Sequence, residues 1–202
     1  QRLLTFSRLG TFARRRARHL SGGMKQKLAL CCALVHTPEL LILDEPTTGV
    51  DPLSRREFWS ILTDLHGQGV TIVVSTPYMS EAHHCTELLL LHEGAVMRHG
   101  DPTALLSGLP VDIYRVTGGD DVLNVKHADR VPADGMLVYP VAGVLHIAVD
   151  KADARSPDTL LSVVRTLEPH ATAIHPHEPT IEDLFFHALN QGPESHEEAA
   201  HG

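Results

Sequence analysis

The sequence predicts an α/β fold, in which a partial α/β domain is followed by a smaller α+β region. Residues 40–43 form a short, wholly apolar run that ends in two acids, and residues 70–75 form a second, β-branched run. A helical pattern separates them, and the order strand, helix, strand calls for a right-handed crossover in a parallel sheet. With 202 residues, 43% of them hydrophobic, the chain can bury one ordinary core and a smaller second one.

The first predicted helix precedes the apolar run. Leu28, Cys31, Cys32 and Val35 recur at the spacing of one helical face, and we expect this face to be buried. The helix is entered after Ser21 and should end at Thr37-Pro38. The strand at residues 40–43 has no polar position, so we expect both of its faces to be buried.

The second predicted helix lies between the two strands. Asp51 and Pro52 have the residue types of an N-cap and a first helical turn. The apolar positions that follow at helical spacing are Phe58, Ile61, Leu62 and Leu65. Gly67 and Gly69 should end the helix.

After a predicted hairpin, the pattern of predicted strands and helices changes. Residues 88–92 and 95–99 predict two strands around Glu93-Gly94, and Gly100-Asp101-Pro102 closes the first domain. Further strands are predicted at residues 111–116, 136–139 and 144–149, with helices after Ser156-Pro157 and after a capping box at residues 180–183. We therefore expect a partial α/β domain at residues 1–107, an α+β accessory region at 108–190 and a disordered polar tail at 191–202.

Charge and cysteine content restrict the class of protein. The chain has 17 basic and 25 acidic residues, a net charge of −8, which disfavours sequence-independent binding to nucleic acid. Its three cysteines form no disulfide framework and no CxxC pair, which favours a reducing compartment such as the cytosol. No apolar stretch approaches the roughly 20 residues that a membrane-spanning helix needs.

Ser21, Gly22 and Gly23 open the first predicted helix and form a candidate anion site. A helix N-terminus presents backbone N–H groups and the positive end of the helix dipole, and glycines let a phosphate oxygen approach closely. Serine and glycine are also common as ordinary helix caps, so a purely structural role remains the alternative.

Asp44 and Glu45 follow the apolar strand directly and form a candidate catalytic pair. The carboxyl edge of an α/β sheet is where such folds bind ligands. The first acid suits Mg²⁺, and the second can orient and deprotonate a water that attacks a γ-phosphate. The alternative is a strand end that carries surface charges.

The order and spacing of these features resemble the ABC ATPase family. Residues 20–24 look like its signature motif, with Met24 where glutamine is commonest. Residues 40–44 look like Walker B, and Glu45 matches the catalytic glutamate. Residues 47–51 look like the D-loop, with Asp51 at its aspartate. The motif-level resemblance covers residues 1–107. Residues 178–185 are similar to the closing helix of exporter-type subunits that serve ABC-2 permeases.

This resemblance implies a function and partners. It implies that two such domains pair head to tail, as a homodimer or a tandem fusion, so that Ser21, Gly22 and Gly23 complete the site around ATP held by the opposite domain. Asp44 with Mg²⁺ and Glu45 then serve the ATP of their own domain. It also implies an ATP-hydrolysing subunit that drives an integral membrane permease, peripheral on the cytoplasmic face of the cell membrane.

Two departures from the family pattern stand out. None of the lysines, Lys25, Lys27, Lys126 and Lys151, ends a GxxxxGK[ST] pattern, so the chain lacks a Walker A motif and, with it, the Q-loop region. We expect a truncation, with a natural stand-alone form as the alternative. Where the family places a switch histidine, this chain has Pro77, which offers neither a side-chain donor nor a backbone N–H.

Pro77 predicts slow hydrolysis or a complete reliance on Glu45, unless it only sets a turn that neighbours such as Tyr78 or His83 compensate. Two other functions stay open: a soluble ABC ATPase in DNA maintenance or translation, and a non-hydrolysing regulatory fragment. Fifteen histidines suggest metal binding, but no set of four converging ligands with a recognisable spacing is present.

Overall fold

The chain forms two compact units, Gln1–His84 and Cys85–Gly202. The computed structural model describes residues 9–36, 38–118 and 135–192. The division lies before the hairpin, whereas the sequence predicted a boundary after residue 107. The hairpin and the short helix behind it group with the second unit because both pack against the last helix of the chain. Most of the predicted tail, residues 193–202, lies outside the described residues.

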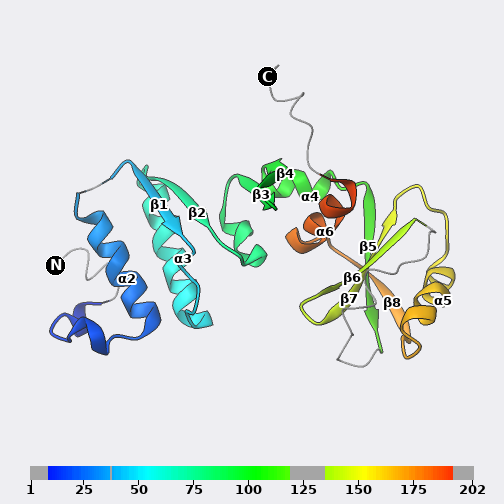
Figure 1. Cartoon of the computed structure of the whole chain (residues 1–202), viewed down its shortest axis with the longest axis horizontal. Coiled ribbons are helices and arrows are strands. Elements are labelled where there is room, and N and C mark those ends of the chain that lie inside the picture. Colours follow the sequence, from blue (N-terminus) through cyan, green and yellow to red (C-terminus); the bar gives the residue numbers. More distant parts are fainter. Residues whose placement is uncertain (1–8, 37, 119–134, 193–202) are drawn as a thin grey trace, which may run out of the picture. The chain divides into compact units, whose positions relative to one another are not determined.

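The described residues of the first unit form two helices and two parallel strands, together with short 3-10 turns (Figure 1). Its regular elements are α2 (Gly22–Ala33), β1 (Leu40–Asp44), α3 (Pro52–Gly67) and β2 (Thr71–Ser75), and its 3-10 turns are η1 (Gly10–Phe12), η2 (Ala17–His19), η3 (Leu34–His36) and η4 (Met79–His84). Strands β1 and β2 pair in parallel from Leu40 with Thr71 to Asp44 with Ser75. The predicted order of strand, helix and strand is therefore confirmed.

Helix α3 packs as its sequence predicts. The Asp51 side chain accepts a hydrogen bond from the Ser54 backbone N–H at 2.9 Å, and Pro52 occupies the first turn. The residues of α3 that are buried are Phe58, Trp59, Ile61, Leu62 and Leu65. This apolar face contributes more buried hydrophobic residues to the first unit than any other described element.

The prediction that β1 is buried on both faces is wrong. Leu41 is 5% exposed, but Ile42 and Leu40, on the opposite face, are 70% and 51% exposed. Val73 of β2 continues this uncovered face at 52% exposure. Within the described residues a helix layer covers one face of the two strands only, and we call the other the bare face of the β1–β2 sheet.

The prediction of which face of α2 is buried is also wrong. Cys31 is buried, but Cys32 and Val35 are exposed. The residues of α2 and its following turn that are buried are Gly23, Lys27, Leu30, Cys31 and Leu34. The buried face includes a lysine because Lys27 forms an ion pair with Glu57 of α3, which neutralises its charge at the contact between the helices.

In the second unit, residues 85–118 and 135–192 form a hairpin, a four-stranded antiparallel sheet and three α-helices (Figure 1). The elements are β3 (Leu88–His92), β4 (Ala95–Gly100), α4 (Pro102–Ser107), β5 (Val111–Thr117), β6 (Met136–Val141), β7 (Val144–Asp150), α5 (Pro157–Leu167), β8 (Ala173–His177) and α6 (Ile181–Gln191). The sheet order is β6-β7-β5-β8. Helix α4 and strand β8 were not predicted; the other elements match the predicted ones within a few residues.

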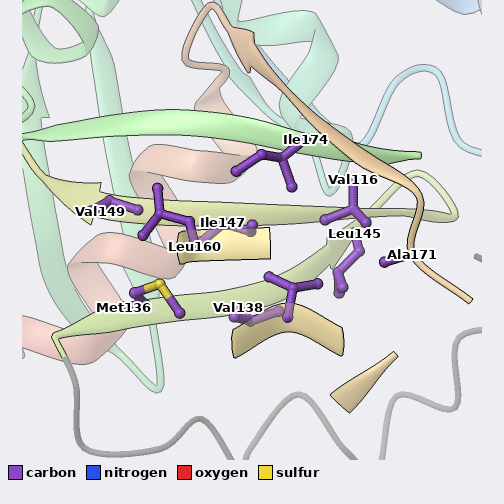
Figure 2. Packing of buried hydrophobic residues seen from close by; sticks show 10 residues of the cluster. Val116, Met136, Val138, Leu145, Ile147, Val149, Leu160, Ala171 and Ile174 are labelled. Carbon is purple, nitrogen blue, oxygen red and sulfur yellow. The ribbon is translucent and has the colours of Figure 1, made fainter. Parts of the chain in front are cut away.

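The core of the second unit lies between its sheet and α5. Figure 2 shows side chains of β5, β6, β7 and β8 packed around Leu160 of α5. Ile147 and Val164 are 0% exposed at its centre. Alternate positions of the same strands face the other way, where Tyr139 and His146 hydrogen-bond to Asp183 of α6. The sheet is therefore covered by a helix on each face.

None of the helices in the described part of the chain is both long and apolar enough to span a bilayer.

Candidate functional site

Asp44 and Glu45 lie at the carboxyl end of β1, and both are exposed. Ser75, the register partner of Asp44 on β2, connects them. Its hydroxyl donates a hydrogen bond to Asp44 Oδ1 and accepts one from the Glu45 backbone N–H at 3.1 Å. The same N–H also lies 3.0 Å from the Ser75 carbonyl oxygen. One serine thus fixes both acids against the end of the second strand.

Glu45 has a backbone conformation that is unusual for glutamate. Its φ is +44°, in the left-handed region that costs a non-glycine residue roughly 1 kcal/mol or more. Two contacts with Thr48 help to hold it: the Thr48 N–H donates to the Glu45 carbonyl at 3.2 Å, and Thr48 Oγ1 donates to Glu45 Oε2 at 3.1 Å. The turn directs the chain sharply away from the strand immediately after the acid, as a site at a sheet edge requires.

The loop between β1 and α3 packs against the N-terminus of α2. Gly49, with φ +72°, places its carbonyl oxygen 3.4 Å from where a Cβ of Gly22 would stand. A Cβ on Gly23 would lie 2.5 Å from the Cβ of Ser54, and 3.2 Å from Cγ1 of Val50. Gly23 is therefore required for packing within this unit, since any side chain there would collide with the first turn of α3.

Ser21 and Gly22 remain exposed at the N-terminus of α2. Ser21 Oγ accepts a hydrogen bond from the Met24 N–H at 3.3 Å, so it is a helix cap. The cap uses the hydroxyl as an acceptor and leaves its O–H able to donate to an anion. The structural and the anion-binding interpretations of this serine are compatible.

Asp51 caps α3 close to this helix end. Hydrogen bonds from the Ser54 backbone and side chain lower the pKa of Asp51 from its ordinary value, so the carboxylate is ionised at neutral pH. Its exposed position leaves it accessible from outside the unit. The sequence predicted both its capping role and its place in the loop.

Pro77 is exposed two residues beyond the end of β2, on the side of the sheet edge where Ser75 holds the two acids. The neighbouring backbone is held by Thr76, whose Oγ1 accepts from the Tyr78 N–H at 3.1 Å. The Tyr78 ring packs under the guanidinium of Arg55, 3.9 Å from the ring centroid. Pro77 thus lies in an ordered turn that follows the strand directly.

The structure brings the predicted residues together in two groups. Asp44, Glu45 and Pro77 follow the carboxyl ends of the two paired strands, while the glycines of α2 pack against the loop that ends at Asp51. The sequence analysis missed three residues that hold this arrangement: Ser75, Thr48 and Glu81. Two of them had a signal in the sequence: Ser75 ends the strand that the pattern pairs with β1, and Thr48 lies in the run 47–51.

The exposed oxygens at this edge fit Mg²⁺. Magnesium in phosphate-transfer sites is commonly held by one or two carboxylates together with phosphate oxygens, and Asp44 and Glu45 provide oxygens of this type. The described residues contain no group of three or more His, Cys, Asp or Glu side chains placed to bind a metal by themselves. A magnesium site here would therefore depend on the nucleotide for further ligands.

The chain is similar in sequence to ATP-binding proteins of the ABC type. Residues 1–48 match the family model described as ABC transporter. The chain is 53% identical over 141 residues to the "Probable multidrug ABC transporter ATP-binding protein YbhF" of Escherichia coli (strain K12), which covers 67% of this chain and 24% of that protein. It belongs to the family of ABC transporter ATP-binding proteins.

The chain is also similar to a second curated protein and to a solved structure. The "Nod factor export ATP-binding protein I" of Paraburkholderia xenovorans (strain LB400) is 43% identical over 122 residues, 59% of this chain and 40% of that protein. The solved structure of cbiO1 from Clostridium perfringens, part of the ABC transporter complex cbiONQ, has 28% identity and a TM-score of 0.49, and covers 53% of this chain and 43% of that one. The chain thus spans less than half the length of each of these proteins.

Proposed function

We propose that this chain contributes the hydrolytic acids and one helix end to an ATP-hydrolysing cassette that powers a membrane exporter. The observation that carries the proposal is the exposure of Asp44 and Glu45 at the carboxyl end of β1, next to a loop against which the N-terminus of α2 packs. This arrangement supports the proposal, because groups suited to Mg²⁺, to water activation and to phosphate binding would then share a single loop.

Each residue has a distinct role in this proposal. Asp44 binds Mg²⁺, directly or through water, while Ser75 orients its carboxylate. Glu45 accepts a proton from the water that attacks the γ-phosphate. Mg²⁺, when bound, would neutralise charge that develops on the phosphate oxygens. The Ser21 hydroxyl and the N–H groups of α2 stabilise the γ-phosphate of ATP held by a second ABC ATPase domain.

The ATP phosphates also need a cradle. The 202 residues contain no GxxxxGK[ST] pattern, so a phosphate-binding loop must come from other sequence. The bare face of the β1–β2 sheet fits the place where such a segment would pack: Ile42 is 70% exposed there, and Asp44 shares its face two residues on. Groups that cover this face would be brought next to the magnesium ligand.

The names of the relatives favour export as the process. One is described as a probable multidrug transporter subunit and another as a Nod factor export subunit. We therefore propose an integral membrane permease as partner, and a position on the cytoplasmic face of the membrane. A soluble ABC ATPase acting on DNA or ribosomes is the second candidate, favoured by no observation on this chain. Copurification with an integral membrane protein supports the first, and copurification with ribosomes or DNA the second.

The decisive test is the dependence of ATP hydrolysis on Glu45. In a cassette that contains this chain together with a Walker A segment, Glu45→Gln should lower kcat by roughly 100-fold or more, because a general base is lost. A steady-state phosphate-release assay measures this. Glu93→Gln is the matched control, since Glu93 is also an exposed glutamate with positive φ, at +49°, but lies in the hairpin turn. Equal rates for wild type and Glu45→Gln would contradict the proposal.

A further inference from the structure

Glu81 is a buried carboxyl group in the first unit that no motif accounts for. It is 3% exposed and lies in the turn η4 that follows Pro77. Buried carboxyl groups are costly unless they are hydrogen-bonded, so its partners show what it holds. Those partners belong to three separate segments of the chain.

Two threonines bind the two oxygens of Glu81. Thr47 Oγ1 donates to Glu81 Oε1 at 2.8 Å, and Thr76 Oγ1 donates to Glu81 Oε2 at 2.7 Å. Thr47 is fully buried and lies two residues after Glu45, while Thr76 immediately precedes Pro77. The Glu81 side chain therefore bridges the loop that follows the catalytic acid and the turn that follows β2.

A third segment joins the bridge through Arg55. Its Nε lies 3.5 Å from Glu81 Oε1, an ion-pair distance, and its guanidinium packs on the Tyr78 ring. The Arg55 backbone N–H donates to the Asp51 carbonyl at 2.9 Å, in the first turn of α3. Glu81 is thus connected to the capped start of α3 as well as to the two loops.

We propose that Glu81 is a positioning residue that sets the relative placement of the Glu45 loop and the Pro77 turn. The inference rests on the proposed function for its catalytic consequence, but the bridge itself concerns the folded chain alone. Hydrolysis depends on a water held between the base and the γ-phosphate, and misplacement of such groups by about 1 Å can cost roughly 100-fold in rate. A buried bridge of two hydrogen bonds restricts that placement.

The bridge predicts coupled protection of backbone amides in the 202-residue chain. Hydrogen exchange should be measured at the Tyr78 N–H, bonded to Thr76, and at the Val50 N–H, bonded to the Thr47 carbonyl at 3.1 Å. Glu81→Ala should accelerate exchange at both amides by roughly tenfold, because the buried Thr47 hydroxyl and the partly buried Thr76 hydroxyl lose their acceptor. Glu81→Gln should stay within about twofold of wild type, since an amide can bond to both hydroxyls.

A cross-effect separates positioning from a local packing defect. Thr47→Val keeps the side-chain volume and removes only the hydroxyl, and it should accelerate exchange at Tyr78, on the far side of the bridge, by about threefold. In the Glu81→Ala background the same change should add nothing at Tyr78, because the bridge is already absent. If Thr47→Val affects only its own loop, or if Glu81→Ala leaves either amide unchanged, the inference is overturned.

The effect of Glu81 on catalysis is measured in a separate experiment. In a cassette whose hydrolysis depends on Glu45, Glu81→Ala should lower kcat at least about tenfold with the KM for ATP within twofold, and Glu81→Gln should restore most of the rate. Asp183→Asn is the control, since it removes another buried carboxylate, from the second unit. If Glu81→Ala accelerates exchange at both amides as predicted, but the cassette shows no Glu45-dependent hydrolysis, the proposed function is rejected and the bridge is retained. An unchanged kcat in an active cassette would reject the positioning role.

Discussion

Gly23 lies where the first turn of α2 meets the first turn of α3. Its missing side chain leaves room for Ser54, whose Cβ and Oγ would be 2.5 and 2.7 Å from a Cβ at this position. Such contacts cannot be relieved by rotating a side chain, because the Ser54 Cβ is fixed by its backbone. The glycine therefore couples the candidate phosphate-binding helix end to the loop that carries Asp51.

Gly23→Ala should destabilise the first unit by about 1–3 kcal/mol, the usual cost of overpacking. Urea denaturation of the 202-residue chain, followed by Trp59 fluorescence, measures this change. Gly22→Ala is the matched control: a Cβ there would meet only the Gly49 carbonyl oxygen, at 3.4 Å. We expect its effect to be smaller by at least about 1 kcal/mol. Equal effects of the two substitutions would show that the contact with Ser54 is not the cause.

Pro77 offers no hydrogen-bond donor at the sheet edge. Because Pro77 is exposed, a histidine side chain can be accommodated there without displacing core residues. In a cassette that hydrolyses ATP, Pro77→His should raise the steady-state rate by about tenfold, less than the roughly 100- to 1,000-fold effect of a fully preorganised donor to a developing charge. Pro77→Ala restores the backbone N–H but no side-chain donor, and should leave the rate near wild type. An unchanged rate in Pro77→His would count against a role for this position.

At the scale of elements, β1 has one covered and one uncovered face, and the two should respond differently to truncation. Leu41→Ala removes a side chain that is 5% exposed and should cost about 2–5 kcal/mol. Ile42→Ala alters a side chain that is 70% exposed and should change stability by less than about 0.5 kcal/mol. Chemical denaturation of the 202-residue chain compares them. A large effect of Ile42→Ala in this chain would mean that the face is covered after all.

A buried carboxylate, Asp183, hydrogen-bonds helix α6 to the sheet, in addition to the packing of the buried side chains Ile181, Leu184 and Ala188. Asp183 is 0% exposed; it accepts hydrogen bonds from Tyr139 Oη and His146 Nδ1 at 2.8 Å each, and completes a capping box with Thr180. Burial acts to raise the pKa of Asp183, but the bonds from His146, Thr180 and Tyr139 outweigh it and lower the pKa below its ordinary value. The folded state therefore favours the ionised form.

This shift makes the second unit acid-sensitive. A carboxyl group whose folded pKa is depressed stabilises the fold above its unfolded pKa of about 4, and the contribution is lost as pH falls through the folded value. Asp183→Asn should cost roughly 2–4 kcal/mol at pH 7, and its cost should shrink towards pH 2. Denaturation curves between pH 2 and pH 7, recorded by circular dichroism, test this. A cost that is constant over this range would contradict the assigned cause.

At the scale of the whole molecule, the chain carries acids and a helix end but no phosphate-binding loop motif. A nucleotide is held mainly through its phosphates, so we expect the 202-residue chain to show little ATP binding by itself. Isothermal titration with MgATP should give no saturable heat at micromolar concentrations. Micromolar affinity that survives Asp44→Asn would show that the chain binds nucleotide by some other site.

The sequence alone determined which residues follow the strand, which residue caps α3, and which amphipathic face of α3 is buried, because these depend on local periodicity and on side chains within one turn. It also identified the family, whose motifs are short and contiguous. It misjudged the buried face of α2 because Lys27 is neutralised by Glu57, 30 residues away.

Only the tertiary structure showed which residues contact segments that are distant in the sequence, because a local sequence pattern holds no information about such contacts. The bare face of β1 follows from how many layers pack on the sheet, and no periodicity within a five-residue strand reports that number. Gly23 is required because Ser54 approaches it, and Glu81 is buried because threonines on two loops converge on it. Contacts between distant segments form only when the chain is folded. Such contacts, for example those of Ser75, hold Asp44 and Glu45 in position.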